Sequence, residues 1–271
     1  MTIEQALAAA QALGLGRLDS TLLLAHRLRR PREWLIAHAD ATPDADSLAA
    51  FFDDCRHRAD GVPVAYLTGR RAFMDLELEV TPAVLVPRPE TETLAQWAIE
   101  RLRALPLARP RVVDLGTGSG ALALAIASAC PHAEVTATDC SDAALAVARA
   151  NADRLNLKVR FAQGDWWHAV GRTHFDLAVC NPPYIAAGDP HLAALRHEPQ
   201  DALVAGALGL DALAKVIWQA VGHLSGWLLV EHGWSQADDV TRLLSGAGFL
   251  RAETRLDLGD LPRCTGGHTA P

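Results

Sequence analysis

Residues 111–120 read RVVDLGTGSG, a short apolar run that leads into three glycines at alternate positions. The run predicts a buried strand over 111–115, and the alanine-rich stretch after Gly120 predicts a helix. Glycines between a strand and a helix let the backbone approach a ligand closely and adopt positive φ angles. Such a turn is typical of sites for NAD, FAD or S-adenosylmethionine. No lysine follows the glycines, which disfavours a nucleoside triphosphate.

Strand-like and helix-like segments alternate along the rest of the chain. The predicted strands cover 111–115, 133–139, 159–163, 175–180, 227–231 and 249–254, and the predicted helices cover 143–155, 210–221 and 235–244. This alternation indicates an α/β fold, with a doubly wound, Rossmann-like and mostly parallel sheet. Ligands of such sheets bind beyond the carboxyl ends of the strands, where the glycine turn lies.

Asp139 closes the second predicted strand, 19 residues after Gly120. An acidic side chain in this position can accept hydrogen bonds from both hydroxyls of a bound ribose. The alternative is a cap for the helix that begins near Ser141. The spacing and the place at the strand end favour the ribose role. The residues predicted to contact the same ligand are Gly116, Thr117, Gly118, Ser119 and Gly120.

Asp165 and Trp166 follow the third predicted strand. The Asp165 carboxylate can accept the amino group of an adenine, and the Trp166 ring can cover the base. A turn followed by a buried aromatic residue explains the pair equally well, so both interpretations stay open here. Trp167 is expected to pack in the core.

Asn181-Pro182-Pro183-Tyr184 follows the strand predicted over 175–180, at the same sheet edge as the glycine turn. An amide or exocyclic amino nitrogen is a poor nucleophile because its lone pair is delocalised. The Asn181 side-chain oxygen and the Pro182 carbonyl can bind its two N–H bonds and direct the lone pair toward a methyl group. The prolines stiffen the loop, and the Tyr184 ring can stack on a planar substrate. The motif therefore predicts S-adenosylmethionine-dependent methylation of a planar nitrogen, with Asn181, Pro182 and Tyr184 as catalytic residues.

The two ends of the chain differ from this pattern. Residues 1–60 show helical spacing of apolar residues and no glycine-rich turn, which predicts a small helical bundle. Residues 61–89 predict a β-hairpin linker, because 62–69 and 76–80 alternate as strands do. A helix over 90–105 then opens a catalytic domain of residues 90–271. The polar, glycine-rich 265–268 are expected to be loose, which leaves a last strand after Arg263 open.

Composition and charge exclude several classes of protein. The 25 basic and 32 acidic residues give a net charge of −7, which disfavours direct binding of nucleic acid because phosphate contacts supply much of that affinity. Five cysteines without a CxxC pair and 11 scattered histidines predict neither a disulfide framework nor a metal site. No apolar stretch is as long as a membrane span, and the N-terminus lacks a signal-peptide pattern. A cytoplasmic protein is expected.

Several segments together carry a family resemblance over nearly the whole chain. They are AYLTG at 65–69, VLVPRPETE at 84–92, DLGTGSG at 114–120, NPPYI at 181–185, Glu198-Pro199 before Ala202-Leu203, and LLVEHG at 228–233. In this order they resemble the release-factor glutamine methyltransferase family, also called PrmC/HemK. His197 departs from the pattern, since the family often has an aromatic residue there.

The resemblance implies methylation of the side-chain nitrogen N5 of the glutamine in the Gly-Gly-Gln loop of class I peptide chain release factors, by a monomer. It implies cofactor contacts at Gly116–Gly120, Asp139, Trp166 and Asn181. Substrate contacts fall on Asn181, Pro182, Pro183 and Tyr184. Arg88 and Glu90 are expected to order the loop over the substrate pocket, with an interdomain ion pair as the alternative. Residues 1–60 are expected to dock the release factor.

Two other functions stay open. A nucleic-acid N6-adenine or N2-guanine methyltransferase would use the same Asn181–Tyr184 motif. The acidic charge and the lack of a basic tail count against it, because a base-flipping enzyme must grip the backbone around the extruded base. A non-catalytic S-adenosylmethionine-binding protein is the other possibility, and the intact motif counts against it.

Overall fold

The computed structural model describes residues 1–269 of the chain. The chain divides into two compact units, and the second begins at Arg71. Among the described residues, no helix combines the length and the apolar character needed to cross a membrane.

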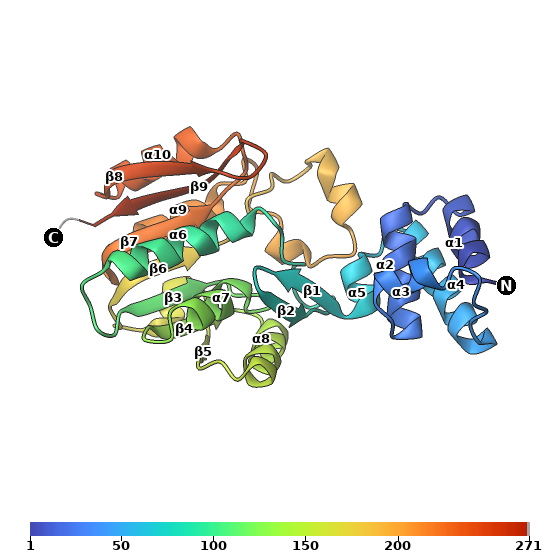
Figure 1. Ribbon diagram of the computed structural model, residues 1–271. Helices are drawn as coiled ribbons and strands as arrows, with labels where there is room; N and C mark the ends of the chain where they lie inside the picture. Colours follow the sequence, from blue (N-terminus) through green and yellow to red (C-terminus); the bar gives the residue numbers. More distant parts are fainter. Residues whose placement is uncertain (270–271) are drawn as a thin grey trace. The chain divides into compact units, whose positions relative to one another are not determined.

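The N-terminal unit is the helical bundle that the sequence predicts. Its helices are α1 (Ile3–Ala12), α2 (Arg17–Leu28), α3 (Arg32–Ala37), α4 (Ala45–Ala59) and α5 (Val64–Thr68) (Figure 1). Leu23, Leu24 and Phe51 are fully buried in its core. A two-pronged ion pair joins α2 to α4, with the Arg27 Nε and Nη2 atoms 2.5 and 2.6 Å from the Asp54 carboxylate oxygens.

Helix α5 replaces a predicted strand, so the expectation of strand structure over 62–69 was wrong. Pro63 stands before the helix with φ −57°, a value its ring imposes and a helix accepts. Gly69 ends the helix in the left-handed region, with φ +71°. Over so few residues, an alternating apolar pattern does not separate a period of 2 from one of 3.6.

The predicted hairpin is present further along, as β1 (Arg70–Phe73) and β2 (Leu76–Glu79). Asn151 of α8 (Asp142–Leu155) is fully buried and holds β2 in place. Its Oδ1 accepts the Glu79 N–H at 2.7 Å, and its Nδ2 donates to the Glu79 and Ser119 carbonyls at 2.9 and 3.0 Å. One amide thereby connects the hairpin to the glycine turn.

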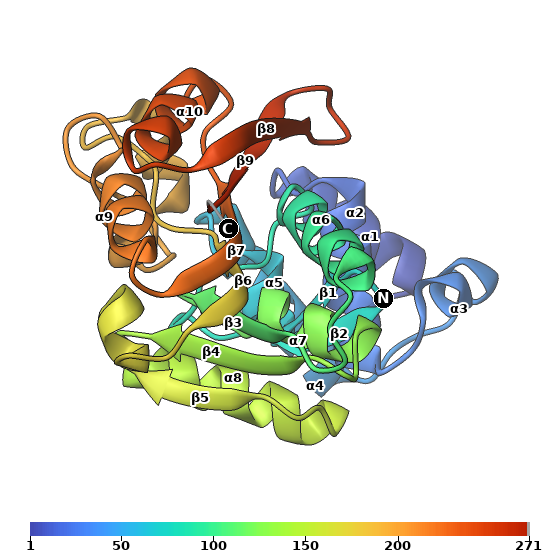
Figure 2. The same cartoon turned by 90° about the vertical axis from the view of Figure 1, so that its left-hand side faces the viewer.

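A seven-stranded sheet forms the centre of the second unit, in the order β5-β4-β3-β6-β7-β9-β8 (Figure 2). The strands are β3 (Arg111–Leu115), β4 (Glu134–Asp139), β5 (Arg160–Gln163), β6 (Phe175–Cys180), β7 (Leu224–Glu231), β8 (Leu250–Leu256) and β9 (Pro262–His268). The first five in this order are parallel neighbours, and β9 runs antiparallel to β7 and β8. The predicted Rossmann-like, mostly parallel sheet is confirmed.

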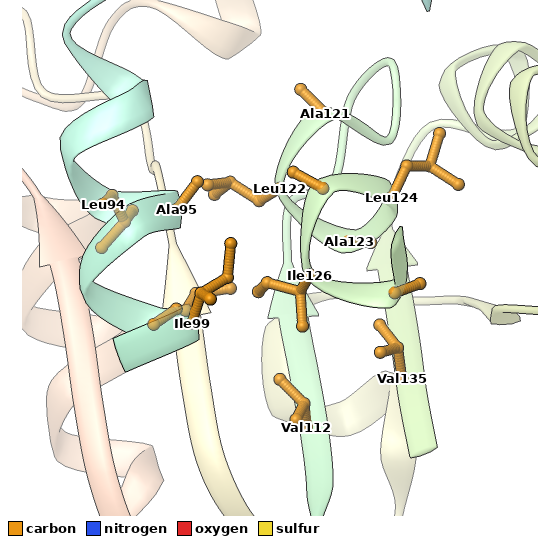
Figure 3. Close-up of a cluster of buried hydrophobic side chains, with 14 of the residues drawn as sticks. Leu94, Ala95, Ile99, Val112, Ala121, Leu122, Ala123, Leu124, Ile126 and Val135 are labelled. Carbon is orange, nitrogen blue, oxygen red and sulfur yellow. The ribbon is translucent and has the colours of Figure 1, made fainter. Parts of the chain in front are cut away.

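Helices cover the sheet on both faces because adjacent strand residues point in opposite directions. The remaining helices are α6 (Thr91–Ala104), α7 (Ala121–Ala129), α9 (Asp211–Ala220) and α10 (Ala237–Gly246), with short 3₁₀ turns η1 (Trp166–Val170), η2 (Pro190–Leu195) and η3 (Gln200–Ala202). Val112 packs in the cluster under α6 and α7, whereas Val113 packs in the cluster with α9 and α10. Figure 3 shows Ile99 of α6 and Ile126 of α7 meeting above Val112 of β3.

Residues 262–268 form strand β9, so the expectation that 265–268 would be loose was wrong. Strand β9 has glycines where neighbouring groups lie too close to leave room for a Cβ atom. A Cβ at Gly266 would lie 2.4 Å from Leu229 Cδ2 and 2.9 Å from the Trp97 ring. A Cβ at Gly267 would lie 2.9 Å from Phe249. Glycine in a strand interior often marks such an approach of packed groups.

Replacing Gly266 by alanine should therefore destabilise the protein. Overpacking a tight core costs about 1–3 kcal/mol of unfolding free energy, measurable by urea denaturation. Gly222→Ala is the matched control, because its Cβ would meet nothing within 4 Å, and it should change stability by less than about 0.5 kcal/mol. Equal stabilities of the two variants would contradict close packing at β9.

Candidate active site

Four predicted segments meet at the carboxyl edge of the sheet. Gly116 follows β3, Asp139 ends β4, Asp165 lies just after β5, and Asn181 follows β6. These strands are parallel and adjacent, so their carboxyl ends share one edge. All four residues line one cavity of about 400 Å³, a size that suits a nucleoside-containing ligand.

The glycine turn forms one wall of this cavity. Gly116, Gly118 and Gly120 have φ values of +74°, +55° and +88°, a region that favours glycine. A Cβ at Gly116 would lie 3.0 Å from the Trp166 ring, and one at Gly120 would lie 2.9 Å from Leu124. Side chains at these two positions would therefore push on the Trp166 ring and on helix α7.

Asp114 forms hydrogen bonds that stabilise the glycine turn. Its Oδ2 accepts the Thr117 hydroxyl at 2.6 Å and the Ala123 N–H at 3.1 Å, while Oδ1 is buried without a hydrogen-bond partner. Complete burial raises the pKa of Asp114 to about 7, against these two hydrogen bonds, which lower it. The carboxyl group holds the turn and the start of α7 together.

Asp139 presents a carboxylate to the cavity. Its Oδ2 accepts the Gly118 N–H and its Oδ1 accepts the Ser141 N–H, each at 2.9 Å. Each oxygen has a further lone pair for a ligand hydroxyl. The Ser141 hydroxyl, rather than Asp139, caps α8, by accepting the Ala144 N–H at 3.2 Å. The ribose role of Asp139 stays a prediction.

Trp166 lines the cavity, and so does Asp165. The Asp165 carboxylate forms an ion pair with Lys215 of α9 at the surface. Trp166 adopts a left-handed backbone conformation with φ +50°, rare for a bulky residue. Trp167 packs in the core, fully buried, and its Nε1 donates to the Val216 carbonyl at 2.8 Å.

The predicted catalytic tetrapeptide divides into two pairs. Asn181 and Pro183 line the cavity, whereas Pro182 and Tyr184 are not among its lining residues. The Asn181 Nδ2 donates to Thr91 Oγ1 at 3.1 Å. The Tyr184 hydroxyl donates to Glu231 Oε1 at 3.1 Å, behind the cavity wall. Stacking of a substrate on the Tyr184 ring stays a prediction.

Arg88 also lines the cavity and is held by Glu198. The Arg88 Nη2 lies 2.5 Å from Glu198 Oε1, and the Val86 N–H donates to the other carboxylate oxygen at 3.0 Å. Glu198 is buried, and both residues belong to the second unit, so this ion pair does not join the two units. Glu90 is half-buried directly before α6.

Three buried residues contribute to the site without having been assigned a role from sequence. Asn151 supports the glycine turn, Thr91 lines the cavity and accepts a hydrogen bond from Asn181, and Glu231 accepts one from Tyr184. Burial raises the pKa of Glu231 to about 7 and that of Tyr184 above its ordinary value. Thr91 belongs to the segment PRPETE and Glu231 to the segment LLVEHG. The sequence therefore showed both segments, but not the contacts that these two residues make.

Comparison with known proteins places the chain in a family. The PrmC N-terminal domain profile matches residues 2–69, and the Methyltransferase small domain profile matches residues 95–203. The release factor glutamine methyltransferase of Bordetella pertussis is 46% identical over 94% of this chain and 96% of its own length. That of Xylella fastidiosa (strain Temecula1) is 47% identical over 97% and 96%. This chain belongs to the release factor glutamine methyltransferase family.

Membership makes the chain a methyltransferase with S-adenosylmethionine as cofactor. The residues present fit that cofactor, because a glycine wall, a strand-end carboxylate and an aromatic ring surround one cavity. Solved structures agree on the fold. The hMettl16 catalytic domain in complex with MAT2A 3′UTR hairpin 1 has a TM-score of 0.58 at 14% identity and covers 84% of each chain. Thermus thermophilus 16S rRNA N2 G1207 methyltransferase has a TM-score of 0.55 at 20% identity over 74% of this chain and 50% of its own.

Replacing Asp114 by asparagine should flatten the pH dependence of stability. Because its pKa rises from 3.8 to about 7 on folding, the contribution of Asp114 is complete below about pH 4 and is lost as pH rises through 7. Urea titrations give the unfolding free energies of wild type and of Asp114→Asn. The difference between them, wild type minus variant, should fall by up to roughly 4 kcal/mol between about pH 4 and pH 8. A constant difference would show that Asp114 folds as an ordinary carboxylate.

Proposed function

We propose that this protein transfers a methyl group from S-adenosylmethionine to the side-chain nitrogen N5 of the glutamine in the Gly-Gly-Gln loop of class I peptide chain release factors. The observation that carries the proposal is the likeness to curated release factor glutamine methyltransferases over nearly the full length of both proteins. The placement of Asn181 on the cavity wall beside the glycine turn supports it.

The residues at the cavity are suited to methylating an amide. When bound, S-adenosylmethionine supplies an electrophilic methyl group on a sulfonium. The Asn181 Oδ1 and the Pro182 carbonyl would accept the two N–H bonds of the glutamine amide, which turns its nitrogen lone pair toward the methyl carbon. Bound S-adenosylmethionine would supply the methyl group to this nitrogen, and water would take the proton that the nitrogen loses. Orientation can account for much of the rate.

The cofactor would be held by the walls of the 400 Å³ cavity. The backbone of 116–120 would face its methionine portion and Asp139 its ribose hydroxyls. Asp165 and Trp166 would contact the adenine. Arg88, fixed by Glu198, would order the segment before α6 along the substrate side, with Glu90 at the start of that helix.

The release factor itself would be held in part by the N-terminal helical unit, whose PrmC N-terminal domain match motivates this assignment. We also propose that the protein acts as a monomer in the cytoplasm. The proposal includes no direct contact with nucleic acid, in keeping with the net charge of −7.

A transfer assay tests the substrate. The protein is incubated with methyl-labelled S-adenosylmethionine and, separately, with a release factor, the same factor with its Gly-Gly-Gln glutamine replaced by alanine, total RNA, and DNA. We expect label only on the release factor that keeps the glutamine of its Gly-Gly-Gln loop. Label on RNA or DNA instead would establish a nucleic-acid methyltransferase, and no label on any of them would favour a binding protein.

Two variants should separate cofactor binding from catalysis. Asp139→Ala removes an acceptor of ribose hydroxyls and should weaken cofactor binding by about 10- to 100-fold in calorimetric titrations. Asn181→Ala should lower kcat by about 100-fold or more, with cofactor affinity retained within a few-fold. If the Asn181 variant turned over at the wild-type rate, Asn181 would have no part in orienting the substrate.

A further inference from the structure

We propose that Gln236 is a positioning residue that holds the Asn181–Tyr184 loop in the orientation needed for methyl transfer. The inference deepens the proposed function and rests on it, because it takes the Pro182 carbonyl to be an acceptor for the substrate amide. Gln236 is not among the residues that line the cavity, so it would act through the loop and not on the substrate itself.

The side-chain amide of Gln236 connects three segments at the carboxyl edge of the sheet. Its Oε1 accepts the Gly233 N–H at 2.8 Å, in the turn that follows β7. Its Nε2 donates to the carbonyl oxygens of Tyr184, Leu208 and Gly209, at 3.1, 3.2 and 3.3 Å. An N–H group can only donate and a carbonyl oxygen can only accept, so these contacts allow one orientation of the amide.

Gln236 is itself fixed, because it stands at the start of a helix. It is the N-cap residue of α10, and its backbone N–H donates to the Gly233 carbonyl at 2.8 Å. Two residues of that helix, Val240 and Leu244, are fully buried in the apolar cluster that α9 and α10 form with the sheet. The amide is therefore presented from an element whose place is set by core packing.

The tetrapeptide transmits the position of its far end to its centre. The rings of Pro182 and Pro183 fix two φ angles, and each proline also restricts the residue before it. Few backbone rotations are left between Asn181 and Tyr184, so the segment moves as one piece. Asn181 is set in place by β6, which ends one residue earlier, and Tyr184 by the Gln236 amide. A shift of the Tyr184 carbonyl would therefore turn the Pro182 carbonyl away from the substrate.

Gly209 leaves room for this contact. It has φ +71°, and a Cβ there would lie 2.2 Å from the Tyr184 carbonyl oxygen and 3.0 Å from Gln236 Nε2. A side chain at position 209 would thus push on both partners of the hydrogen bond. Gly188, in the same connection between β6 and α9, has φ +88°, and a Cβ there would meet nothing within 4 Å. The two glycines have a similar backbone and differ in their surroundings, which makes them a matched pair for a test.

The first test removes one half of the Gln236 amide at a time, in the full chain with a release factor as substrate. Gln236→Glu keeps an acceptor for the Gly233 N–H but has no N–H to donate at neutral pH, and it should lower kcat by about 10- to 100-fold. Gln236→Lys loses that acceptor but can still donate to the carbonyls, and it should keep kcat within about fivefold of wild type. Both variants should bind S-adenosylmethionine within about twofold of wild type, because they leave the cavity wall unchanged.

The second test approaches the same hydrogen bond from the other side. Gly209→Ala should lower kcat by about 10- to 100-fold, whereas Gly188→Ala should keep it within about threefold of wild type. Both alanines bear the cost of a positive φ, so that cost does not explain a difference in kcat. An equal loss of kcat in the two variants would assign the effect to backbone strain and would contradict the proposal.

Hydrogen exchange followed by mass spectrometry reports on the loop without any turnover. The N–H groups of Ile185 and Ala187 donate to the carbonyls of Leu203 and Gly206 at 2.9 and 2.8 Å, so they mark the order of the chain just after the tetrapeptide. Peptides that contain these groups should exchange at least about fivefold faster in Gln236→Glu than in wild type or in Gln236→Lys.

The outcomes separate this inference from the proposed function. Wild-type kcat and unchanged exchange in Gln236→Glu would overturn the positioning role while the transfer of label to release factor still stood. A loss of cofactor affinity equal to the loss of kcat would also contradict it, because the defect would not be confined to the substrate loop. If the wild-type protein labelled no release factor, the proposed function would fail, and faster exchange in Gln236→Glu would still show that the amide holds the loop.

Discussion

Parallel pairing of β3 with β4 on one side and β6 on the other is the constraint on which the site depends. The register sets Leu115 opposite Thr138 and also opposite Cys180, so the residues that follow these three strands emerge at one level. Glycine turn, acidic strand end and Asn181 are consequently neighbours, although 65 residues separate Gly116 from Asn181 in the sequence. The crossover helices and their apolar clusters keep this register by covering both faces of the sheet.

Buried polar groups then shape the loops beyond the strand ends. Asp114 holds the glycine turn, Asn151 joins it to the hairpin, and Glu198 holds the segment that leads into α6. Glu231 serves the tetrapeptide loop through Tyr184. Each of these groups has hydrogen bonds to the backbone or to polar side chains, so each restricts a loop to one conformation while partly meeting the cost of its own burial. Together, the hydrogen bonds of these buried groups make the cavity wall rigid.

Some of the architecture could be read from sequence and some could not. The strands of the parallel sheet were predicted closely, because buried strands between glycine turns and amphipathic helices have a strong local signature. The helix α5 was missed because five residues do not resolve two periodicities. The strand β9 was left open because its glycines make room for Leu229, Trp97 and Phe249, which come from other elements. Glycine by itself does not distinguish a flexible end from a crowded strand.

The residue sequence alone determined the sheet class, the cofactor turn and the tetrapeptide that follows β6, because each of these is a local pattern with a local physical cause. It also placed Thr91 and Glu231 within recognisable segments. Only the tertiary structure decided that Thr91 bonds to Asn181 and Glu231 to Tyr184, and that Arg88 pairs with Glu198 across 110 residues of chain. Side-chain partners of this kind depend on the register of the sheet and the docking of α6, which arise when distant segments pack and leave no periodic trace in the chain.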